Sequence, residues 1–371
     1  MKFDDILNED LSPKWEVIWE IPEFKACIDV PQNTDWHKEK VHEHIKNVTD
    51  VMWEFVCGNQ PLDPRHDKKA LMLSAICHDL GKATNTKWDE KEQQWKCSFH
   101  GKAGDRITRK LFWEEPDIEL REKVCWMVRY HMDFHYITDA GMVNNNKLTN
   151  LLTGRANIGE MGLLYYCDCM GSVNDKQSEA DVLKVLDKVS KTTFPRFNDK
   201  EMMNFFYYGE RRDLEAKTKP IIYVMCGIPG SGKSTFFDNY LKDNAVPVSR
   251  DIIREQLGMT KDNIKFKGNK QQEEEVTRVF NREVGRLLKE GKNIVLDNMN
   301  TRKKYRDEYH KKWMKYNPGW VYICCEAPTF EESVNRRDGQ IPREEMEKIF
   351  DNYDYPEPHE YDKVIYHRSN D

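Results

Sequence analysis

The sequence lacks long apolar runs, paired cysteines and an excess of basic charge. Its longest apolar runs are about six residues, far short of the roughly 20 that a membrane-spanning helix needs. The ten cysteines include no C-x-x-C pair, which argues against a zinc knuckle or disulfide framework and favours buried thiols in a reducing compartment. The first residues, MKFDDILNED, are too acidic for a signal peptide. We therefore expect a cytoplasmic protein without a membrane partner.

The balance of charge is slightly acidic. The chain has 64 Asp and Glu against 58 Lys and Arg, for a formal net charge of −6. This argues against a protein that coats nucleic acid through a uniformly basic surface. Local basic tracks stay open, although such charge runs on helices are more often solvated faces. The two candidate tracks are Lys261, Lys265, Lys267 and Lys270, and Arg302, Lys303, Lys304 and Arg306.

The sequence does have the length and the aromatic content for more than one core, with 371 residues, ten Trp, 16 Phe and 16 Tyr. Helical periodicity dominates before about residue 215, and short apolar runs alternate with charged helices after it. The stretch 190–220 is the best linker candidate, and it contains a candidate short helix at 199–208. We predict a domain over 1–210 with its core at about 33–175, and a second over 211–371 with its core at about 220–367.

The two predicted domains belong to different fold classes. The first is predicted to be all-helical. The second follows the βαβα pattern of a parallel sheet covered by helices on both faces. Its expected strands are 221–226, 246–249, 293–297, 320–326 and 363–366. Its expected helices are 233–241, 252–257, 272–290, 302–316, 330–337 and 343–353.

A glycine-rich segment, GIPGSGKS at 227–234, lies between the first of these strands and the first helix. It fits the phosphate-binding pattern GxxxxGK[ST], in which backbone N–H groups and a helix N-terminus surround the phosphates. A chance glycine-rich turn is the alternative, and the flanking strand and helix disfavour it. We predict that ATP, or another nucleoside triphosphate, binds here with Mg²⁺. Lys233 is placed to reach the β- and γ-phosphates and Ser234 to ligate Mg²⁺; the expected contacts are Gly227, Gly230, Ser231, Gly232, Lys233, Ser234 and Thr235.

Charged residues at other element ends suit phosphoryl transfer. Asp251 follows the second strand, where it could accept the proton of an attacking hydroxyl, and Arg254 lies one helical turn on. Asp297 ends the third strand and could hold Mg²⁺ through water or orient Lys233. Arg336 precedes the turn at 338–342, where a lid arginine would stabilise the transferred group. Helix caps and solvated arginines are the alternatives for these residues.

The loop and these residues together resemble the kinase domain of bacteriophage polynucleotide 5′-kinases, over about residues 220–367. That family combines GxPGSGKST with Arg-Asp-x-x-Arg, Asp-x-Asn and a lid arginine. The resemblance implies that Asp251 is the general base on a 5′-hydroxyl and that Arg254 contacts the 3′-phosphate of the substrate. The lid arginine of the family is most similar to Arg336. The lid looks shorter than that of the phage enzymes, so a second lid arginine has no clear counterpart.

In the first domain, histidines and aspartates recur on the apolar faces of predicted helices. His78–Asp79 follows Leu71 and Ala75 at helical spacing. A core histidine with an ordinary partner explains any one of them, whereas the whole set favours a metal centre. Imidazole and carboxylate ligands without thiolate suit Mn, Fe, Ni, Co or Zn. The other stripes are Val41, His44 and Val48; His100, Ala103, Gly104, Ile107 and Leu111; Val124, Val128 and His131; and Met161, Leu164, Tyr165 and Asp168.

This pattern resembles the HD phosphohydrolase superfamily over about residues 33–175. The minimal set of that superfamily maps to His44, His78, Asp79 and Asp168. His100 and His131 match the extra histidines that some members use for a second metal ion, so one or two ions are expected. The resemblance implies that the metal centre activates a water for attack on phosphorus. Lys82 could neutralise phosphate oxygens, and His37 could contact substrate or simply lie on the surface.

Together the halves resemble the HD-Pnk family of bifunctional end-healing enzymes. The resemblance implies phosphorylation of 5′-OH ends and removal of 2′,3′-cyclic phosphate, 2′-phosphate or 3′-phosphate ends of RNA or DNA. It also implies a separate ligase as partner, because the chain has no ligase part. Two other classes stay open. One is a small-molecule kinase for nucleosides or sugars fused to a nucleotide phosphohydrolase, and the other is a nucleotide-sensing regulatory ATPase.

Overall fold

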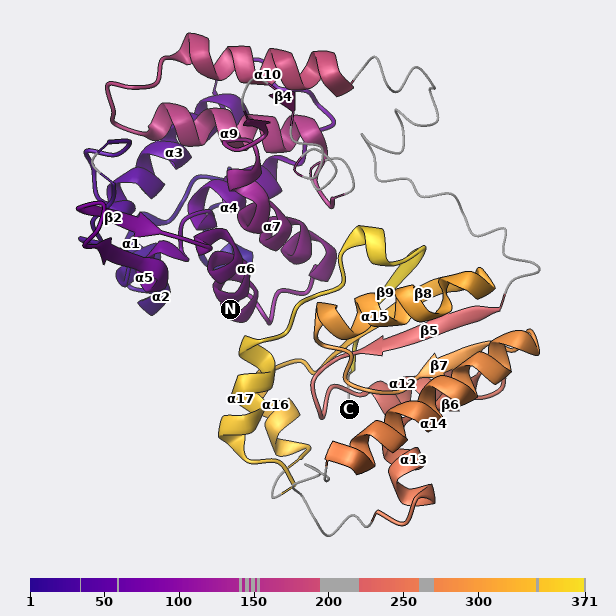
Figure 1. The fold of residues 1–371 in the computed structure, drawn as a ribbon. Coiled ribbons are helices and arrows are strands. Elements are labelled where there is room, and N and C mark those ends of the chain that lie inside the picture. Colours follow the sequence, from indigo (N-terminus) through magenta and orange to yellow (C-terminus); the bar gives the residue numbers. More distant parts are fainter. Residues whose placement is uncertain are drawn as a thin grey trace. The chain divides into compact units, whose positions relative to one another are not determined.

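The computed structural model describes residues 1–33, 35–58, 60–139, 142, 143, 147, 151, 154–193, 220–259, 270–337 and 340–369. The chain divides into two compact units, Met1–Glu210 and Arg211–Asp371, and each is described by itself (Figure 1). The candidate helix at 199–208, Lys261, Lys265, Lys267 and the lid residues 338 and 339 lie outside the described residues.

The first unit is built mainly from helices, as predicted. The longer ones are α3 (Val41–Val56), α4 (Lys68–Cys77), α6 (His100–Leu111), α7 (Ile118–Tyr130), α9 (Ile158–Gly171) and α10 (Glu179–Thr193). The shorter ones are η1 (Phe3–Asp5), α1 (Trp15–Ile18), α2 (Pro22–Lys25), α5 (Lys82–Asn85) and η2 (His131–Asp133).

The prediction of an entirely helical first domain was wrong in one respect. Two short antiparallel hairpins interrupt the helices: β1 (Thr86–Asp89) with β2 (Gln94–Cys97), and β3 (Thr138–Asp139) with β4 (Met142–Val143). In the first hairpin, Trp88 lies opposite Trp95. Such runs of only a few residues are too short for periodicity to separate strand from helix.

Helix α4 is the central helix of this unit. Every residue from Ala70 to Cys77 is buried, and the helix packs against α3, α7 and α9. Asp67 caps its first turn by accepting a hydrogen bond from the backbone N–H of Ala70 at 3.0 Å. His78 and Asp79 directly follow the last turn of α4. Because α4 is buried on all sides, these two residues lie in the middle of the bundle.

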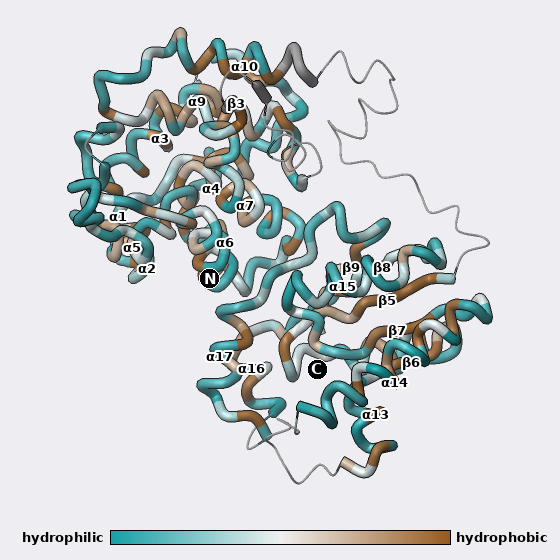
Figure 2. The backbone as a smooth tube through the Cα atoms, viewed as in Figure 1, coloured by the Kyte–Doolittle hydropathy of each residue, from teal (hydrophilic) through white to brown (hydrophobic). Residues whose placement is uncertain are grey.

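The second unit contains a five-stranded parallel sheet in the order β6-β7-β5-β8-β9. The strands are β5 (Ile221–Cys226), β6 (Val246–Val248), β7 (Ile294–Leu296), β8 (Gly319–Glu326) and β9 (Lys363–Arg368), within a few residues of the predicted ones. β5 lies between β7 and β8, and Figure 2 shows β5 and β7 in the brown of apolar residues. Near-continuous burial of β8 is typical of a parallel strand covered on both faces.

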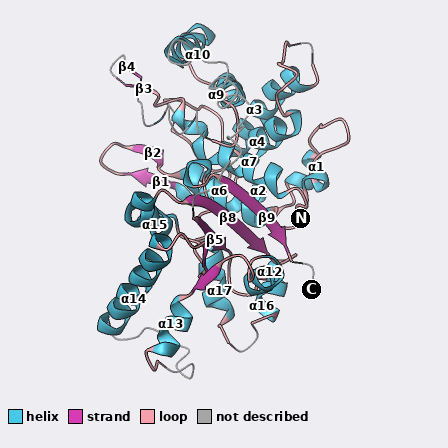
Figure 3. Ribbon diagram, turned by 90° about the vertical axis from the view of Figure 1, so that its right-hand side faces the viewer, coloured by secondary structure: helices cyan, strands magenta, loops and turns pink. Residues whose placement is uncertain are grey.

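Helices cover both faces of this sheet, as predicted. Figure 3 shows α14 (Lys270–Lys289) and α15 (Lys303–Trp313) on one side and α12 (Lys233–Tyr240) and α16 (Phe330–Asn335) on the other. Alternate side chains of the strands face the two layers. Met225, Val295 and Ile323 pack with Phe236 of α12. The remaining helices are α13 (Arg250–Gln256), α17 (Arg343–Asp351), η4 (Met314–Tyr316) and η5 (Pro358–Glu360).

A buried ion pair joins α15 to the segment that leads into β9. Arg306 and Glu360 are both almost completely buried, and the guanidinium Nε and Nη2 donate to the two carboxylate oxygens at 2.8 and 3.0 Å. Arg306 also donates to the carbonyl oxygens of Asn300 and Asp354. Arg306 therefore cannot contribute to a basic surface track, because its guanidinium is buried and paired with Glu360 inside the unit.

Replacing Arg306 with Ala should lower the free energy of unfolding of the second unit by about 3–5 kcal/mol, because Glu360 would be left buried without a counter-ion. Urea unfolding followed by circular dichroism measures the change. Arg286→Ala is the matched control, since Arg286 pairs with Glu283 and Glu290 on the exposed face of α14 and its loss should change stability little. Equal losses in both variants would contradict the assignment.

The same pair predicts a loss of stability in acid. Burial by itself would raise the pKa of Glu360, but Arg306 overrides it and holds that pKa below the ordinary value of 4.5. A depressed carboxyl pKa contributes stability that is fully present above the ordinary value and is lost as pH falls through the folded-state value. The stability difference between the wild type and Glu360→Gln should therefore shrink below about pH 4.5 in unfolding titrations. A difference that is constant with pH would contradict this.

Candidate active sites

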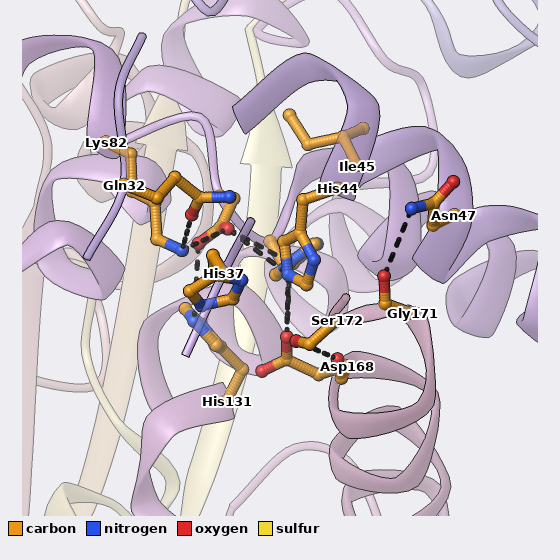
Figure 4. A network of polar contacts seen from close by, with 12 residues as sticks. Gln32, His37, His44, Ile45, Asn47, Lys82, His131, Asp168, Gly171 and Ser172 are labelled. Carbon is orange, nitrogen blue, oxygen red and sulfur yellow. Dashed lines mark hydrogen bonds and ion pairs between the residues drawn. The ribbon is translucent and has the colours of Figure 1, made fainter. Parts of the chain in front are cut away.

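The first unit gathers all six residues that were predicted to bind metal in it into one cluster. Figure 4 shows three of them, His44, His131 and Asp168. His44 comes from α3, His78 and Asp79 follow α4, and His100 opens α6. His131 opens η2 and Asp168 comes from α9. All six are buried, so the bundle surrounds charged and polar groups that five segments supply.

Asp79 is the centre of this cluster. Its Oδ2 lies 3.3 Å from Nε2 of His78 and 3.6 Å from Nε2 of His44. Its Oδ1 lies 3.4 Å from Nε2 of His100 and 3.8 Å from Nε2 of His131. The two oxygens thus face two different groups of donors, and within each group the donor atoms lie within 4.8 Å of one another. This is the arrangement of a carboxylate between two adjacent cation positions.

Asp168 joins the first of these positions. Its Oδ1 lies 2.9 Å from Nε2 of His44 and 3.7 Å from Nε2 of His78. The first position therefore has His44, His78, Asp79 and Asp168 around it, and the second has Asp79, His100 and His131. Two imidazoles with two carboxylates, and no thiolate, suit a divalent transition metal.

Several donor atoms of the cluster are unsatisfied. Nε2 of His78 and both carboxylate oxygens of Asp79 are buried and make no aligned hydrogen bond within the described residues. The ammonium group of Lys82 approaches Oδ2 of Asp79 at 2.7 Å as an ion pair. Burial by itself would raise the pKa of Asp79, but Lys82 and His78 hold it well below the ordinary value. A buried carboxylate that stays ionised in this way fits a site for cations.

Hydrogen bonds to the backbone fix the orientation of His78, His100 and His131. The Nδ1 atoms of these rings lie 2.7–2.8 Å from the carbonyl oxygens of Ala75, Cys97 and Val128, each three residues earlier in the chain. A carbonyl can only accept, so Nδ1 carries the proton and Nε2 keeps its lone pair for a metal ion. Burial lowers the pKa of His131 to about 3, which keeps this ring neutral and able to ligate.

Lys82 and His37 lie beside the cluster, at the positions where substrate contacts were predicted. Lys82 is buried, and its ammonium group donates to Oε1 of Gln32 at 2.6 Å as well as pairing with Asp79. His37 is partly exposed, and its Nδ1 lies 3.0 Å from Oε1 of Glu39. Figure 4 shows His37 between Lys82 and His44.

Sequence reasoning missed Gln32, Glu39 and His135. Nε2 of His135 lies 2.9 Å from Oδ2 of Asp168, on the side away from His44. A weak signal for it existed in the i, i+4 spacing from His131. Glu39 had no periodic pattern to identify it, because it precedes α3 and does not belong to it.

In the second unit, the phosphate-binding loop connects β5 to α12. Gly230 and Gly232 have φ of 79° and 87°, which side chains rarely adopt, and a Cβ at Gly230 would lie 2.3 Å from the carbonyl oxygen of Ser333. Lys233 is partly covered, but its ammonium group is turned into the loop and donates to the carbonyl oxygens of Gly227 and Ile228, both at 2.9 Å. Burial lowers its pKa to about 8.

Other predicted contacts of the triphosphate follow the same edge of the sheet. Ser231 is buried within the loop, whereas Ser234 and Thr235 are exposed in the first turn of α12. Asp297 directly follows β7, which pairs with β5 in parallel. Burial raises the pKa of Asp297, and the charge of Lys233 partly opposes the rise.

Asp251 lies at the start of α13, directly after β6. Ser249, not Asp251, caps this helix: its Oγ accepts the backbone N–H of Asp251 at 3.2 Å. The helix-cap alternative for Asp251 was therefore wrong. Its carboxylate is 81% exposed and pairs with Nη1 of Arg254 at 2.6 Å. β6 pairs with β7 in parallel, so this carboxylate, Asp297 and the loop follow strand ends on one edge of the sheet.

Arg254 and Arg336 are both held by protein groups. Nε and Nη2 of Arg254 donate to the two oxygens of Glu273, both at 2.9 Å. Sequence reasoning missed Glu273 on α14. Arg336, directly after α16, donates to Oγ of Ser369 at 2.6 Å and to the carbonyl oxygen of Gly230 at 3.3 Å. Arg336 therefore lies against the phosphate-binding loop itself.

Comparison with known families matches both units. Residues 41–192 match the HD domain family, and residues 222–356 match an AAA domain family. The second match agrees with the parallel sheet and the phosphate-binding loop of a P-loop kinase-like domain. A P-loop domain of this kind uses a nucleoside triphosphate with Mg²⁺, and an HD domain uses divalent metal ions.

Individual relatives cover only parts of the chain. The CC-adding tRNA nucleotidyltransferase of Thermus thermophilus is 27% identical over 114 residues, which are 30% of this chain and 24% of that protein. The chain therefore spans about a quarter of the length of this curated relative.

None of the helices in the described part of the chain combines the length and the hydrophobicity that crossing a bilayer requires.

Two solved structures are also similar in part. A chain in the structure of the Pnkp1/Rnl/Hen1 RNA repair complex is 28% identical, covers 36% of this chain and 43% of its own length, and has a TM-score of 0.31. A candidate kinase from Chloroflexus aurantiacus is 14% identical, covers 41% of this chain and 86% of its own length, and has a TM-score of 0.33.

Asp79→Asn should abolish metal retention at both positions, because Asp79 offers one oxygen to each. His131→Ala should halve it, since His131 faces only the second position. The measurement is the manganese bound at equilibrium dialysis against excess Mn²⁺, which also counts the ion at the second position. Asp175→Asn, which changes a carboxylate that is 82% exposed, is the control. Full manganese content in Asp79→Asn would rule out the cluster as a metal centre.

Proposed function

We propose that this chain, which has the HD-Pnk architecture of an HD domain followed by a P-loop kinase-like domain, heals broken nucleic-acid ends. The second domain transfers the γ-phosphoryl group of ATP to a 5′-hydroxyl end. The first removes a 2′,3′-cyclic phosphate, a 2′-phosphate or a 3′-phosphate. RNA is the favoured substrate, because a 2′,3′-cyclic phosphate needs the 2′-hydroxyl that only RNA carries.

In the kinase reaction, the 5′-hydroxyl oxygen bonds to the γ-phosphorus, the bond to the β-phosphate oxygen breaks, and ADP leaves. Asp251 takes the hydroxyl proton; its exposure and its freedom from the helix cap support this role. Lys233 and the loop amides hold the phosphates, and Ser234 and Asp297 hold Mg²⁺, directly or through water. Arg336, already bonded to the carbonyl of Gly230, stabilises charge on the transferred group.

Arg254 is the proposed contact for the phosphate on the 3′ side of the substrate nucleotide. Its bidentate pair with Glu273 and its pair with Asp251 fix the guanidinium beside the proposed base. Arg254 would therefore bind an incoming phosphate either beside these carboxylates or in place of one of them. This constrains the acceptor to one that brings its own anion to the site, as a polynucleotide does and a free sugar does not.

In the phosphohydrolase reaction, His44, His78, Asp79 and Asp168 hold one divalent ion, and Asp79, His100 and His131 hold a second. Mn, Ni, Co, Fe and Zn all suit these donors. Ions held by these residues would supply an activated water and neutralise phosphate charge. Lys82 neutralises a further phosphate oxygen, and the partly exposed His37 contacts the substrate.

The observation that carries the proposal is the presence of both sites in one chain: a complete His and Asp cluster in the HD domain, and Asp251 on the loop edge of the kinase sheet. A broken RNA with 5′-hydroxyl and 2′,3′-cyclic phosphate ends needs both changes before joining. The products, a 5′-phosphate and a 3′-hydroxyl, are substrates for ligation, so we expect a separate ligase as partner.

Asp251→Asn should reduce 5′-end phosphorylation by about 10²–10⁴-fold, because the amide cannot accept the hydroxyl proton. Removal of 2′,3′-phosphates should persist. Asp79→Asn should show the opposite loss. Both are measured on one oligonucleotide with a 5′-hydroxyl and a 2′,3′-cyclic phosphate, labelled ATP and Mg²⁺. Asp243→Asn, on the exposed turn after α12, is the control.

Three results would contradict the proposal. Label on nucleosides or sugars but not on oligonucleotides would identify a small-molecule kinase. ATP hydrolysis without any phosphorylated acceptor would identify a regulatory ATPase. Equal loss of both activities in each variant would show one shared site or misfolding.

A further inference from the structure

Glu39 is a buried carboxylate at the edge of the metal centre, in the segment that leads into α3. It is 9% exposed. Its Oε1 lies 3.0 Å from Nδ1 of His37 and 3.2 Å from Nδ1 of His44. Its Oε2 accepts the backbone N–H of Val173 at 3.0 Å, which fixes the carboxylate from the other side.

His44 differs from the other histidines of the cluster in what faces its Nδ1. His78, His100 and His131 each direct Nδ1 at a backbone carbonyl. Nδ1 of His44 is buried and makes no aligned hydrogen bond within the described residues, and the carboxylate oxygen of Glu39 lies beside it. Its Nε2 faces Asp168 and Asp79 at the first cation position.

We infer that Glu39 is a positioning residue for the metal centre, and this inference rests on the metal centre proposed above. Glu39 accepts the Nδ1 proton of His44 and so presents Nε2 to the ion at the first position. Carboxylate–histidine–metal arrangements of this kind fix the ring and raise the basicity of the ligand. Glu39 also adds a negative charge beside that position.

The second position has no such support. His100 and His131 are oriented by neutral carbonyls, and Asp79 is the only carboxylate that the described residues bring to them. Two carboxylates, Asp79 and Asp168, and the nearby Glu39 surround the first position. The first position therefore binds its ion more tightly than the second, and Glu39 is one cause of the difference.

A purely structural role is the competing explanation, because the bond from Val173 to Glu39 ties the start of α3 to the chain that follows α9. The chain provides a matched control for it. Glu43 stabilises the start of α3 by accepting the backbone N–H of Lys40 at 2.8 Å, but it is exposed and directs no metal ligand. Glu43→Gln therefore perturbs the helix start and leaves His44 oriented.

The experiment is calorimetric titration of the metal-free full chain with Mn²⁺ alone. The wild type should show a tight and a weak binding event. Glu39→Ala should weaken the tight event by about 10–100-fold and leave the weak one unchanged. Glu39→Gln should lose less of the affinity of the tight event, because its amide oxygen still accepts a hydrogen bond from Nδ1 of His44. Glu43→Gln should match the wild type, and His131→Ala should remove the weak event.

Wild-type affinity in Glu39→Ala, or an equal loss in Glu43→Gln, would overturn the positioning role and leave the metal centre intact. Absence of any Mn²⁺ binding in the wild type would overturn the metal centre, and the role of Glu39 with it. If Glu39→Ala does not fold, the role of Glu39 is tested by ¹⁵N spectra of the histidine rings in the Zn²⁺-loaded wild type and in Glu39→Gln. These spectra report which ring nitrogen of His44 carries the proton. A His44 ring protonated on Nε2 in the wild type would contradict the inference.

Discussion

The burial of the Asp79 carboxylate is the constraint on which the first unit depends. Asp79 is 1% exposed, and an isolated charge at that depth would be prohibitively unfavourable. Lys82 lies on one side of the carboxylate, and histidines from α3, the end of α4, α6 and η2 surround it. Each of those helices must be present and in register for the charge to be tolerated. Folding of the bundle and assembly of the cation positions are therefore one process.

The second unit solves a different electrostatic problem, that of holding a highly charged ligand on neutral backbone. Gly230 and Gly232 adopt left-handed conformations that bring the loop close to Ser333 and Ser369. Lys233 meanwhile stays inside the loop, on the carbonyl oxygens of Gly227 and Ile228. Burial in this poorly solvated place lowers the pKa of the ammonium. When a phosphate binds, the ammonium group of Lys233 would exchange its carbonyl partners for a fully negative oxygen.

The two centres would act on phosphorus in opposite directions, one adding a phosphoryl group and one removing it. They also use opposite kinds of support. The phosphohydrolase cluster is rigid, because backbone carbonyls and Glu39 orient its histidines from inside the core. Asp251, Arg254 and Arg336 of the second unit lie on or near the surface, where arginine and carboxylate pairs can exchange partners when an anionic ligand binds.

The sequence by itself determined both centres in outline, because local spacing carries that information. The GxxxxGK[ST] pattern needs only consecutive residues, and helical periodicity placed His44, His78, His131 and Asp168 on apolar faces. It did not identify Glu39, Gln32, His135 or Glu273, and it did not predict that Arg306 is buried. These residues act through contacts across the fold, such as Glu39 with Val173 or Arg306 with Glu360. Only the tertiary structure decides such pairs, since burial and partner depend on which segments pack together and not on the neighbours of a residue in the chain.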